Sequence, residues 1–183
     1  MTPRGVILYG PPASGKDTVT AALSELDERF ALLTKLKAGS GRGTGYRYVS
    51  SEDLQALRDA GRLAVETERY GNRYAVDRQD VEDLVEAGRA PVIHMGDTQG
   101  IRELCSAVPL AWTRVRLWVP REITAERSKE RGDTDTARRV EAWDEADADL
   151  RAAGDAVTFD LTIRTDESEP MESAKRIVRA VGF

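Results

Sequence analysis

Residues 10–18 read Gly-Pro-Pro-Ala-Ser-Gly-Lys-Asp-Thr and directly follow the apolar run Val6 to Tyr9. They fit the phosphate-binding pattern G-x-x-x-x-G-K, in which glycines let backbone N–H groups turn toward phosphate oxygens and the lysine adds positive charge. A helix starting near Lys16 would point the positive end of its dipole at the same phosphates. A glycine-rich turn that happens to contain lysine is the alternative, but the strand–loop–helix order favours a nucleoside-triphosphate site. The residues expected in it are Gly10, Pro11, Pro12, Ala13, Ser14, Gly15, Lys16, Asp17 and Thr18.

The chain has 183 residues, of which 40% are hydrophobic and 32% charged, as is usual for a soluble enzyme of one domain. A net charge of −5 speaks against nucleic acid as a partner. No apolar stretch is long enough to span a membrane, and the single cysteine, Cys105, is expected to pack within a helix. Together these features predict a cytoplasmic protein and leave its oligomeric state open.

Apolar, β-branched runs alternate with segments of helical periodicity along the chain. The runs expected to form strands are 6–9, 29–33, 91–95, 113–119 and 159–163. The segments expected to form helices are 18–26, 77–87, 98–107, 121–130, 136–152 and 168–181. This alternation predicts an α/β fold with a parallel, doubly wound sheet of five strands and helices on both faces.

The interval 34–76 breaks this alternation. It is rich in Gly, Lys, Arg and Tyr, and the capping-box spacing of Ser50 and Asp53 marks a helix start within it. We therefore expect a single domain over residues 1–183. Its core would comprise residues 1–33 and 77–183, with residues 34–76 inserted as a lobe.

Several ordered motifs resemble the guanylate kinase family. Residues 61–76 read GRLAVETERYGNRYAV and fit the family pattern G-x-F-L-E-W-A-x-x-x-G-N-x-Y-G-T at Gly61, Leu63, Gly71, Asn72 and Tyr74. Residues 43–50 fit G-x-x-Y-x-F-V-S, and residues 97–100 fit D-x-Q-G. Arg131-Gly132 and Arg138-Arg139 resemble the family's R-G…R-R lid, with a shorter spacer. The resemblance covers essentially the whole chain.

This resemblance implies a three-layer fold with an inserted acceptor-binding lobe and a short lid near residues 131–139. It also implies an ATP-dependent kinase that moves the γ-phosphoryl group of Mg-ATP to a small phosphorylated acceptor, such as GMP or another nucleoside monophosphate. Such a transfer needs alignment and positive charge around the phosphoryl oxygens. The residues expected to supply that charge are Lys16, Arg131, Arg138 and Arg139. Tyr46 and Tyr74 match family tyrosines that hold the acceptor phosphate.

Two departures from the family concern the phosphates. Asp17 stands where a hydroxyl residue usually follows the lysine, and we expect its carboxylate to bind the Mg²⁺ of Mg-ATP, with Thr18 as the fallback. Thr34 and Lys37 replace the arginine pair that holds the acceptor phosphate. Lys35, Lys37 and Arg42 could still attract a phosphate as point charges, although without the bidentate grip of arginine. An exposed basic loop is an equally good reading of these residues.

The base-reading positions depart further. Val65 aligns with the glutamate that accepts hydrogen bonds from guanine, Val76 aligns with a hydroxyl residue that contacts the base, and only Asp97 is retained. Each base group left buried and unpaired costs about 1–3 kcal/mol, so guanine selection should weaken. Glu66 and Glu68 are the acids that could replace the missing carboxylate. A one-residue shift on a regular strand, however, points Glu66 to the opposite face.

Two other functions fit parts of the sequence. Lys16-Asp17 and the missing guanine contacts resemble the ribose 1,5-bisphosphate phosphokinases of the same superfamily, whereas residues 97–100 and Gly71-Asn72 favour the guanylate kinases. A non-catalytic guanylate-kinase-like binding module is the third possibility, and the intact loop speaks against it. ATP and Mg²⁺ are the cofactors expected. Cys and His lack the spacing of zinc ligands, so the Mg²⁺ that ATP carries is the only ion expected. His94 is expected to be a satisfied, partly buried histidine.

Overall fold

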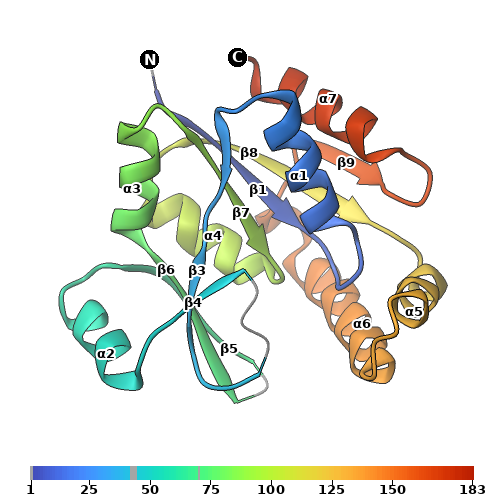
Figure 1. Ribbon diagram of the computed structural model, residues 1–183, viewed down its shortest axis with the longest axis horizontal. Helices are drawn as coiled ribbons and strands as arrows, with labels where there is room; N and C mark the ends of the chain where they lie inside the picture. Colours follow the sequence, from blue (N-terminus) through green and yellow to red (C-terminus); the bar gives the residue numbers. More distant parts are fainter. Residues whose placement is uncertain (1, 42–44, 70) are drawn as a thin grey trace.

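The computed structural model describes residues 2–41, 45–69 and 71–183 (Figure 1). Five parallel strands form its main sheet in the order β2-β7-β1-β8-β9, as the alternating sequence pattern predicts. These strands are β1 (Arg4–Tyr9), β2 (Phe30–Leu32), β7 (Ala90–Met95), β8 (Ala111–Trp118) and β9 (Leu161–Arg164). After β1 the chain forms β2 and β7 on one side of that strand, and then β8 and β9 on the other side. Ligands of parallel sheets bind where the strand order reverses in this way, here at the carboxyl end of β1.

Helices cover both faces of this sheet because side chains alternate along β1. Val6 and Leu8 pack against α1 (Lys16–Leu26) and α7 (Pro170–Val181). Ile7 and Tyr9 face the opposite layer, which includes α3 (Arg78–Glu86) and α4 (Thr98–Ala107). All four of these β1 side chains are fully buried. The core is therefore two apolar layers separated by the sheet, as in a three-layer α/β fold.

A second, smaller sheet lies within the interval expected as an inserted lobe. Its strands follow the order β4-β3-β6-β5, and they are β3 (Lys35–Ala38), β4 (Tyr46–Tyr48), β5 (Leu63–Arg69) and β6 (Asn72–Asp77). Helix α2 (Ser51–Asp59) packs on this sheet through Leu54. The predicted capping box is present, since Ser50 and Asp53 each accept a hydrogen bond from the other's backbone N–H.

Two helices, α5 (Arg121–Glu130) and α6 (Thr136–Ala153), form a hairpin whose connection contains the first residues of the expected lid. A short 3₁₀ turn, η1 (Gly154–Ala156), follows α6. The hairpin and the small sheet project from the same edge of the main sheet (Figure 1). Among the residues that the structure describes, no helix has both the length and the apolar composition needed to cross a membrane.

One carboxylate of helix α6 is hydrogen-bonded to the core. Asp149 accepts hydrogen bonds from the backbone N–H of Thr98 at 2.7 Å and from the Thr98 hydroxyl at 2.8 Å. The Tyr9 hydroxyl lies 3.1 Å from the Ala146 carbonyl oxygen and 3.4 Å from the Asp149 carboxylate. Burial is the first reason that the pKa of Tyr9 is raised. Asp149 thus joins α6, the start of α4 and the end of β1.

Replacing this carboxylate should destabilise the protein. Asp149→Ala removes two short hydrogen bonds and leaves the Thr98 N–H without its acceptor, so the free energy of unfolding should fall by about 2 kcal/mol. Urea unfolding followed by circular dichroism measures the change. Asp147→Ala is the matched control on the same helix, because its ion pair with largely exposed Arg151 lies at the surface, and it should cost under about 0.5 kcal/mol. Equal losses in the two variants would contradict the assigned role of Asp149.

Candidate active site

The loop after β1 is tied down through its carbonyl oxygens. Every carbonyl from residue 10 to residue 15 accepts a hydrogen bond. The donors are Lys16 Nζ for Gly10 and Pro11, Thr124 for Pro12, Arg127 for Ala13, Thr165 for Ser14 and the Val19 N–H for Gly15. Their lengths lie between 2.7 and 3.4 Å. A Cβ at Gly10 would lie 2.3 Å from the Leu117 carbonyl oxygen, so only glycine fits where the loop leaves the sheet.

The N–H groups of the same loop are arranged differently. In the part of the chain that the structure describes, the N–H groups of Gly15, Lys16 and Asp17 have no hydrogen-bond acceptor. Ala13 and Gly15 have φ angles of 60° and 89°, in the left-handed region. This backbone conformation and the start of α1 turn neighbouring N–H groups to one side, where they form an anion-binding concavity.

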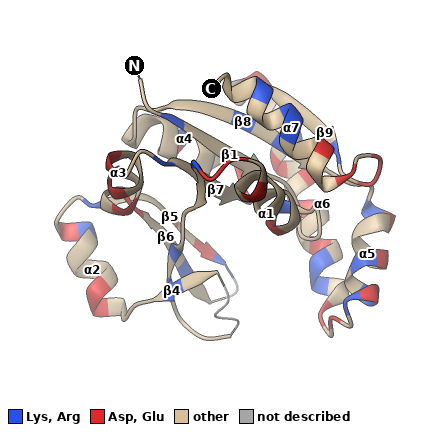
Figure 2. Cartoon of the chain, turned by 45° about the horizontal axis from the view of Figure 1, so that its top comes forward, with Lys and Arg blue, Asp and Glu red and all other residues tan. Residues whose placement is uncertain are grey.

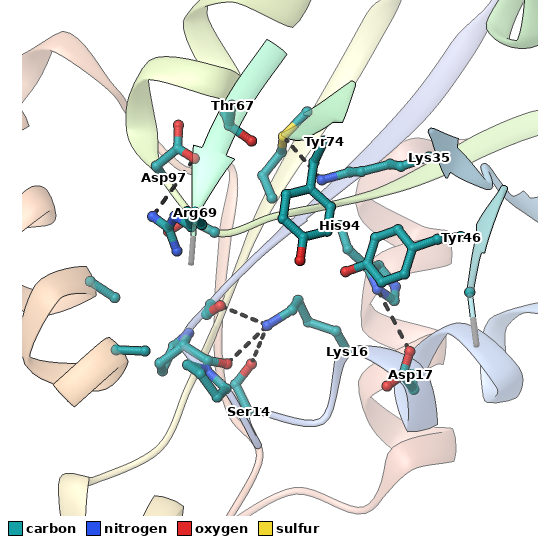
Figure 3. Close-up of a pocket in the computed structure, with 18 of the residues that line it drawn as sticks. Ser14, Lys16, Asp17, Lys35, Tyr46, Thr67, Arg69, Tyr74, His94 and Asp97 are labelled. Atoms are coloured by element: carbon teal, nitrogen blue, oxygen red, sulfur yellow. Dashed lines mark hydrogen bonds and ion pairs between the residues drawn. The ribbon is translucent and has the colours of Figure 1, made fainter. Parts of the chain in front are cut away.

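A cavity of about 360 Å³ opens beside the loop. Its other walls come from the small sheet, the end of β7, and α6 with the residues before it (Figure 3). Most of the residues predicted for the site line it. They are residues 10–17, Lys35, Tyr46, Tyr74, Asp97, Arg131 and Arg139. Lys and Arg residues occur on both flanks of this cavity, on the small sheet and on α6 (Figure 2).

The two glutamates expected to replace the missing carboxylate do not line the cavity, which corrects that expectation. Glu66 forms an ion pair with Arg58 of α2, and Glu68 is exposed. Side chains alternate along a strand, so Val65 and Thr67 of β5 face the cavity while Glu66 and Glu68 point away. Because Glu66 is one residue beyond Val65, its carboxylate lies on the other face of β5 and cannot replace a carboxylate at position 65.

Four other predicted residues also lie outside the cavity lining. Thr34 and Arg138 are exposed, and Thr18 lies on the outer side of the loop. Lys37 is 3% exposed, and its Nζ lies 5.4–5.6 Å from the ring centroids of Tyr46, Tyr48 and Tyr74. Lys37 therefore supports the tyrosines from behind. Arg42 lies outside the described residues.

The tyrosines form the side of the cavity opposite the loop. The ring centroids of Tyr46 and Tyr74 are 5.2 Å apart, and both hydroxyls point toward the space above Lys16 (Figure 3). Lys35 lies beside them, with its Nζ 3.8 Å from Met95 Sδ. Two hydroxyl donors and one ammonium group thus converge on the space next to the loop, a suitable set for a phosphate oxygen.

Sequence reasoning missed Thr67 and Arg69 of β5, which also line the cavity. The sequence could have indicated them, because side chains at positions 65, 67 and 69 of a strand point to the same face. His94, expected to be satisfied and partly buried, shares a hydrogen bond of 2.7 Å between its Nε2 and the Thr20 hydroxyl. Burial, followed by the charge of Lys16, lowers the pKa of His94 to about 4. The imidazole is therefore neutral near pH 7.

The electrostatics of the cavity are dominated by crowded cations. Burial lowers the pKa of Lys16 to about 8, with Lys35, Arg69 and Arg131 adding to this effect and Asp17 opposing it. Burial likewise lowers the pKa of Lys35 to about 8, against the attraction of Asp97. Crowded, partly desolvated cations are costly without an anion. The site is therefore built to receive negative charge.

A parallel sheet with a phosphate-binding loop, an adjoining cationic cavity and an inserted lobe defines a nucleotide-dependent phosphotransferase. The chain belongs to the guanylate kinase family, whose sequence model, described as guanylate kinase, matches residues 2–180. It is therefore an ATP-dependent kinase.

Individual proteins agree with this assignment. The guanylate kinase of Synechocystis sp. is 25% identical in an alignment that covers 97% of this chain and 92% of that protein. The crystal structure of guanylate kinase from Anaplasma phagocytophilum matches with a TM-score of 0.66 at 20% identity, over 97% of this chain and 84% of that one. An unliganded sugar kinase from Janibacter sp. HTCC2649 has a TM-score of 0.57 at 14% identity, over 100% and 96% of the two chains. These two structures establish the shared fold.

The lowered lysine pKa values predict proton uptake when an anionic ligand binds. At pH 8.5 Lys16 and Lys35, with pKa values of about 8, are mostly neutral in the free protein. Bound phosphates favour the ammonium forms and raise both pKa values, so the complex holds more protons than the free protein. Titration calorimetry with Mg-ATP at pH 8.5, in buffers of different ionisation enthalpy, should record uptake of about half a proton or more.

The matching variants localise this uptake. Lys16→Met should reduce it strongly, whereas Lys129→Met, at an exposed position on α5, should leave it unchanged. Proton release in the wild-type protein, or an uptake that survives in Lys16→Met, would contradict the electrostatic description of the cavity.

Proposed function

We propose that the chain transfers the γ-phosphoryl group of Mg-ATP to the phosphate of a nucleoside monophosphate, with GMP as the first acceptor to test. One observation carries the proposal. The unbonded N–H groups of Gly15 and Lys16 adjoin the same cavity that Lys35, Tyr46 and Tyr74 line. A donor phosphate on the loop and an acceptor phosphate at the tyrosines would therefore be neighbours.

A second hollow supports the placement of the donor. It has a volume of about 260 Å³ and lies along the outer side of the loop, between α1, α5 and the residues after β9. Gly15 and Arg131 line both hollows. ATP bound with its nucleoside in the second hollow would extend its phosphates past Gly15 into the first, and Arg131 would lie where the two substrates meet.

The chemistry asked of these residues is alignment and charge neutralisation. Lys16 Nζ, now bound to the carbonyls of Gly10 and Pro11, would exchange these partners for phosphate oxygens. The Tyr46 and Tyr74 hydroxyls and Lys35 would orient the acceptor phosphate for in-line attack. Arg131 would balance charge on the transferring group, as arginines do in other phosphoryl transferases. Movement of the lobe and of the α5–α6 connection toward each other would exclude water.

Magnesium fits the loop as part of Mg-ATP. The Asp17 side chain is 81% exposed beside the phosphate-binding concavity, and Thr18 offers a hydroxyl on the outer side. Mg²⁺ prefers such oxygen ligands together with substrate phosphates. In the described residues no group of three His, Cys, Asp or Glu side chains could hold a metal by itself. When bound, the ion would neutralise phosphate charge, with Asp17 as its protein ligand.

A sugar-phosphate kinase acting on ribose 1,5-bisphosphate is the second candidate. Val65 and Val76 are 4% and 1% exposed and line the acceptor cavity, and neither Glu66 nor Glu68 reaches it. This apolar wall lacks the carboxylate that guanine recognition uses in the resembling family. A non-catalytic binding module is disfavoured because the phosphate-binding loop, Lys16 and Arg131 line hollows that a nucleotide could occupy.

The test is ADP release from Mg-ATP with GMP, dGMP, AMP, CMP, UMP, ribose 1,5-bisphosphate or no acceptor. We expect acceptor-dependent turnover with GMP. In Lys16→Met the turnover rate should fall by about 100-fold or more, because the positive charge that lysine would place beside the transferring phosphates is removed. Lys129→Met should retain full activity. Acceptor-independent ADP release, or no turnover with any of these acceptors, would contradict the proposal, and turnover with ribose 1,5-bisphosphate alone would favour the second candidate.

A further inference from the structure

Val65 leaves the acceptor cavity without a carboxylate at the position where the resembling family reads guanine. Any selection of the acceptor's base must therefore use another polar group at the same end of the cavity. In the described residues, the polar side chains at that end are Thr67, Arg69 and Asp97, which lie together on one side of the cavity (Figure 3). Base selection by these residues rests on the proposed function, since it concerns the acceptor of that same reaction.

Arg69 has unused hydrogen-bonding capacity directed at this space. Its side chain is 36% exposed, and its Nη2 donates to the Gly96 carbonyl at 3.3 Å. The structure describes no acceptor for its Nη1 or Nε. A guanidinium group carries five N–H donors in a rigid plane, so Arg69 can still donate to a ligand in the cavity. It lines the same cavity as Lys16 and Lys35 and acts electrostatically on both.

Asp97 provides an acceptor beside this donor. Its Oδ1 accepts the backbone N–H of Gly100 at 2.6 Å and so caps α4. Its Oδ2 lies 3.8 Å from Arg69 Nη2, which is longer than a hydrogen bond. The carboxylate is therefore fixed in place by α4 and keeps one oxygen for a ligand. Arg69 and Asp97 together present a donor and an acceptor side by side.

This order of donor and acceptor matches one edge of a 6-oxopurine. Guanine and hypoxanthine carry an accepting O6 next to a donating N1–H, whereas adenine carries a donating amino group next to an accepting nitrogen. Arginine donating to guanine O6 is a common pairing in base recognition. The neighbouring walls, Val65, Val76 and Met95, are apolar and suit the faces of a flat ring. A second phosphate or carboxylate would instead meet the charge of Asp97.

We infer that Arg69 and Asp97 select the acceptor by its 6-oxopurine edge, with Arg69 donating to O6 and Asp97 accepting from N1–H. Asp97 Oδ1 already accepts the Gly100 N–H, and Val65 provides no second carboxylate. The 2-amino group of guanine therefore gains less here than it would beside a second acidic side chain. The acceptor class is therefore 6-oxopurine monophosphates, GMP and IMP alike, with AMP excluded. Arg69 is a specificity-determining residue, and it takes over part of the task of the missing glutamate.

The test compares kcat/KM for GMP, IMP and AMP in the wild-type protein, Arg69→Met, Arg69→Lys and Arg73→Met. In the wild type, GMP and IMP should agree within about tenfold, and AMP should be slower by about 100-fold. Arg69→Met should lower kcat/KM for GMP and IMP by about 10- to 100-fold, mainly through KM, and leave AMP unchanged. Arg69→Lys should recover part of the loss. Arg73→Met, at an exposed position on the neighbouring strand outside the cavity lining, should match the wild type.

Three results would overturn this assignment. They are equal use of AMP and GMP, an equal loss for all three nucleotides in Arg69→Met, and a preference for ribose 1,5-bisphosphate that Arg69→Met abolishes. Calorimetric titration of GMP, IMP and AMP into the same variants separates this inference from the proposed function. If Arg69→Met weakens the binding of GMP and IMP, the inference is supported even when no turnover is seen. If Arg69→Met leaves their affinity unchanged, the inference is refuted even when the protein is an active kinase.

Discussion

The fixation of the loop 10–15 through its carbonyl oxygens is the constraint on which the site depends. With these acceptors bonded to α5, α1 and the residues after β9, the following N–H groups have no acceptor in the described part of the chain. The bonds from Thr124, Arg127, Thr165 and the Val19 N–H do not involve Lys16 Nζ, so they can hold this backbone in place when phosphates bind. Dipoles preorganised in this way stabilise charge most effectively. Arg127 also donates to the Thr165 hydroxyl and carbonyl and so joins the loop to the segment after β9.

The two sides of the site differ in how far they depart from the family pattern. The donor side keeps the loop, its glycines and Lys16. On the acceptor side, Thr34 and the enclosed Lys37 stand in place of the arginine pair, and Val65 stands in place of a glutamate. The acceptor tyrosines remain, supported by Lys37 behind their rings. The donor side therefore keeps the residues of the family pattern, and the acceptor side is where this chain departs from it.

Much of the fold could be predicted from the sequence, because strand and helix periodicities are local and the five apolar runs all form parallel strands. The loop residues were predictable for the same reason. In the polar wall of the acceptor cavity, Asp97 was predicted, and Thr67 and Arg69 were missed although they alternate with Val65, because the sequence does not show what lies opposite that face of β5. Glu66 pairs with Arg58 of α2, while Thr67 and Arg69 turn inward. Likewise, the position of Lys37 behind three tyrosines follows from the pairing of β3 with β4 and β6, which residue spacing alone does not reveal.

The most direct test of the central claim is a crystal structure with a ligand in which adenosine and guanosine are joined through a chain of five phosphates. Phosphate oxygens are expected on the N–H groups of Gly15 and Lys16, with Lys16 Nζ moved from the carbonyls of Gly10 and Pro11 to the phosphate chain. Guanine is expected against Arg69 and Asp97. A complex in which Lys16 keeps its carbonyl partners, or in which the phosphates avoid the loop, would contradict this description of the site.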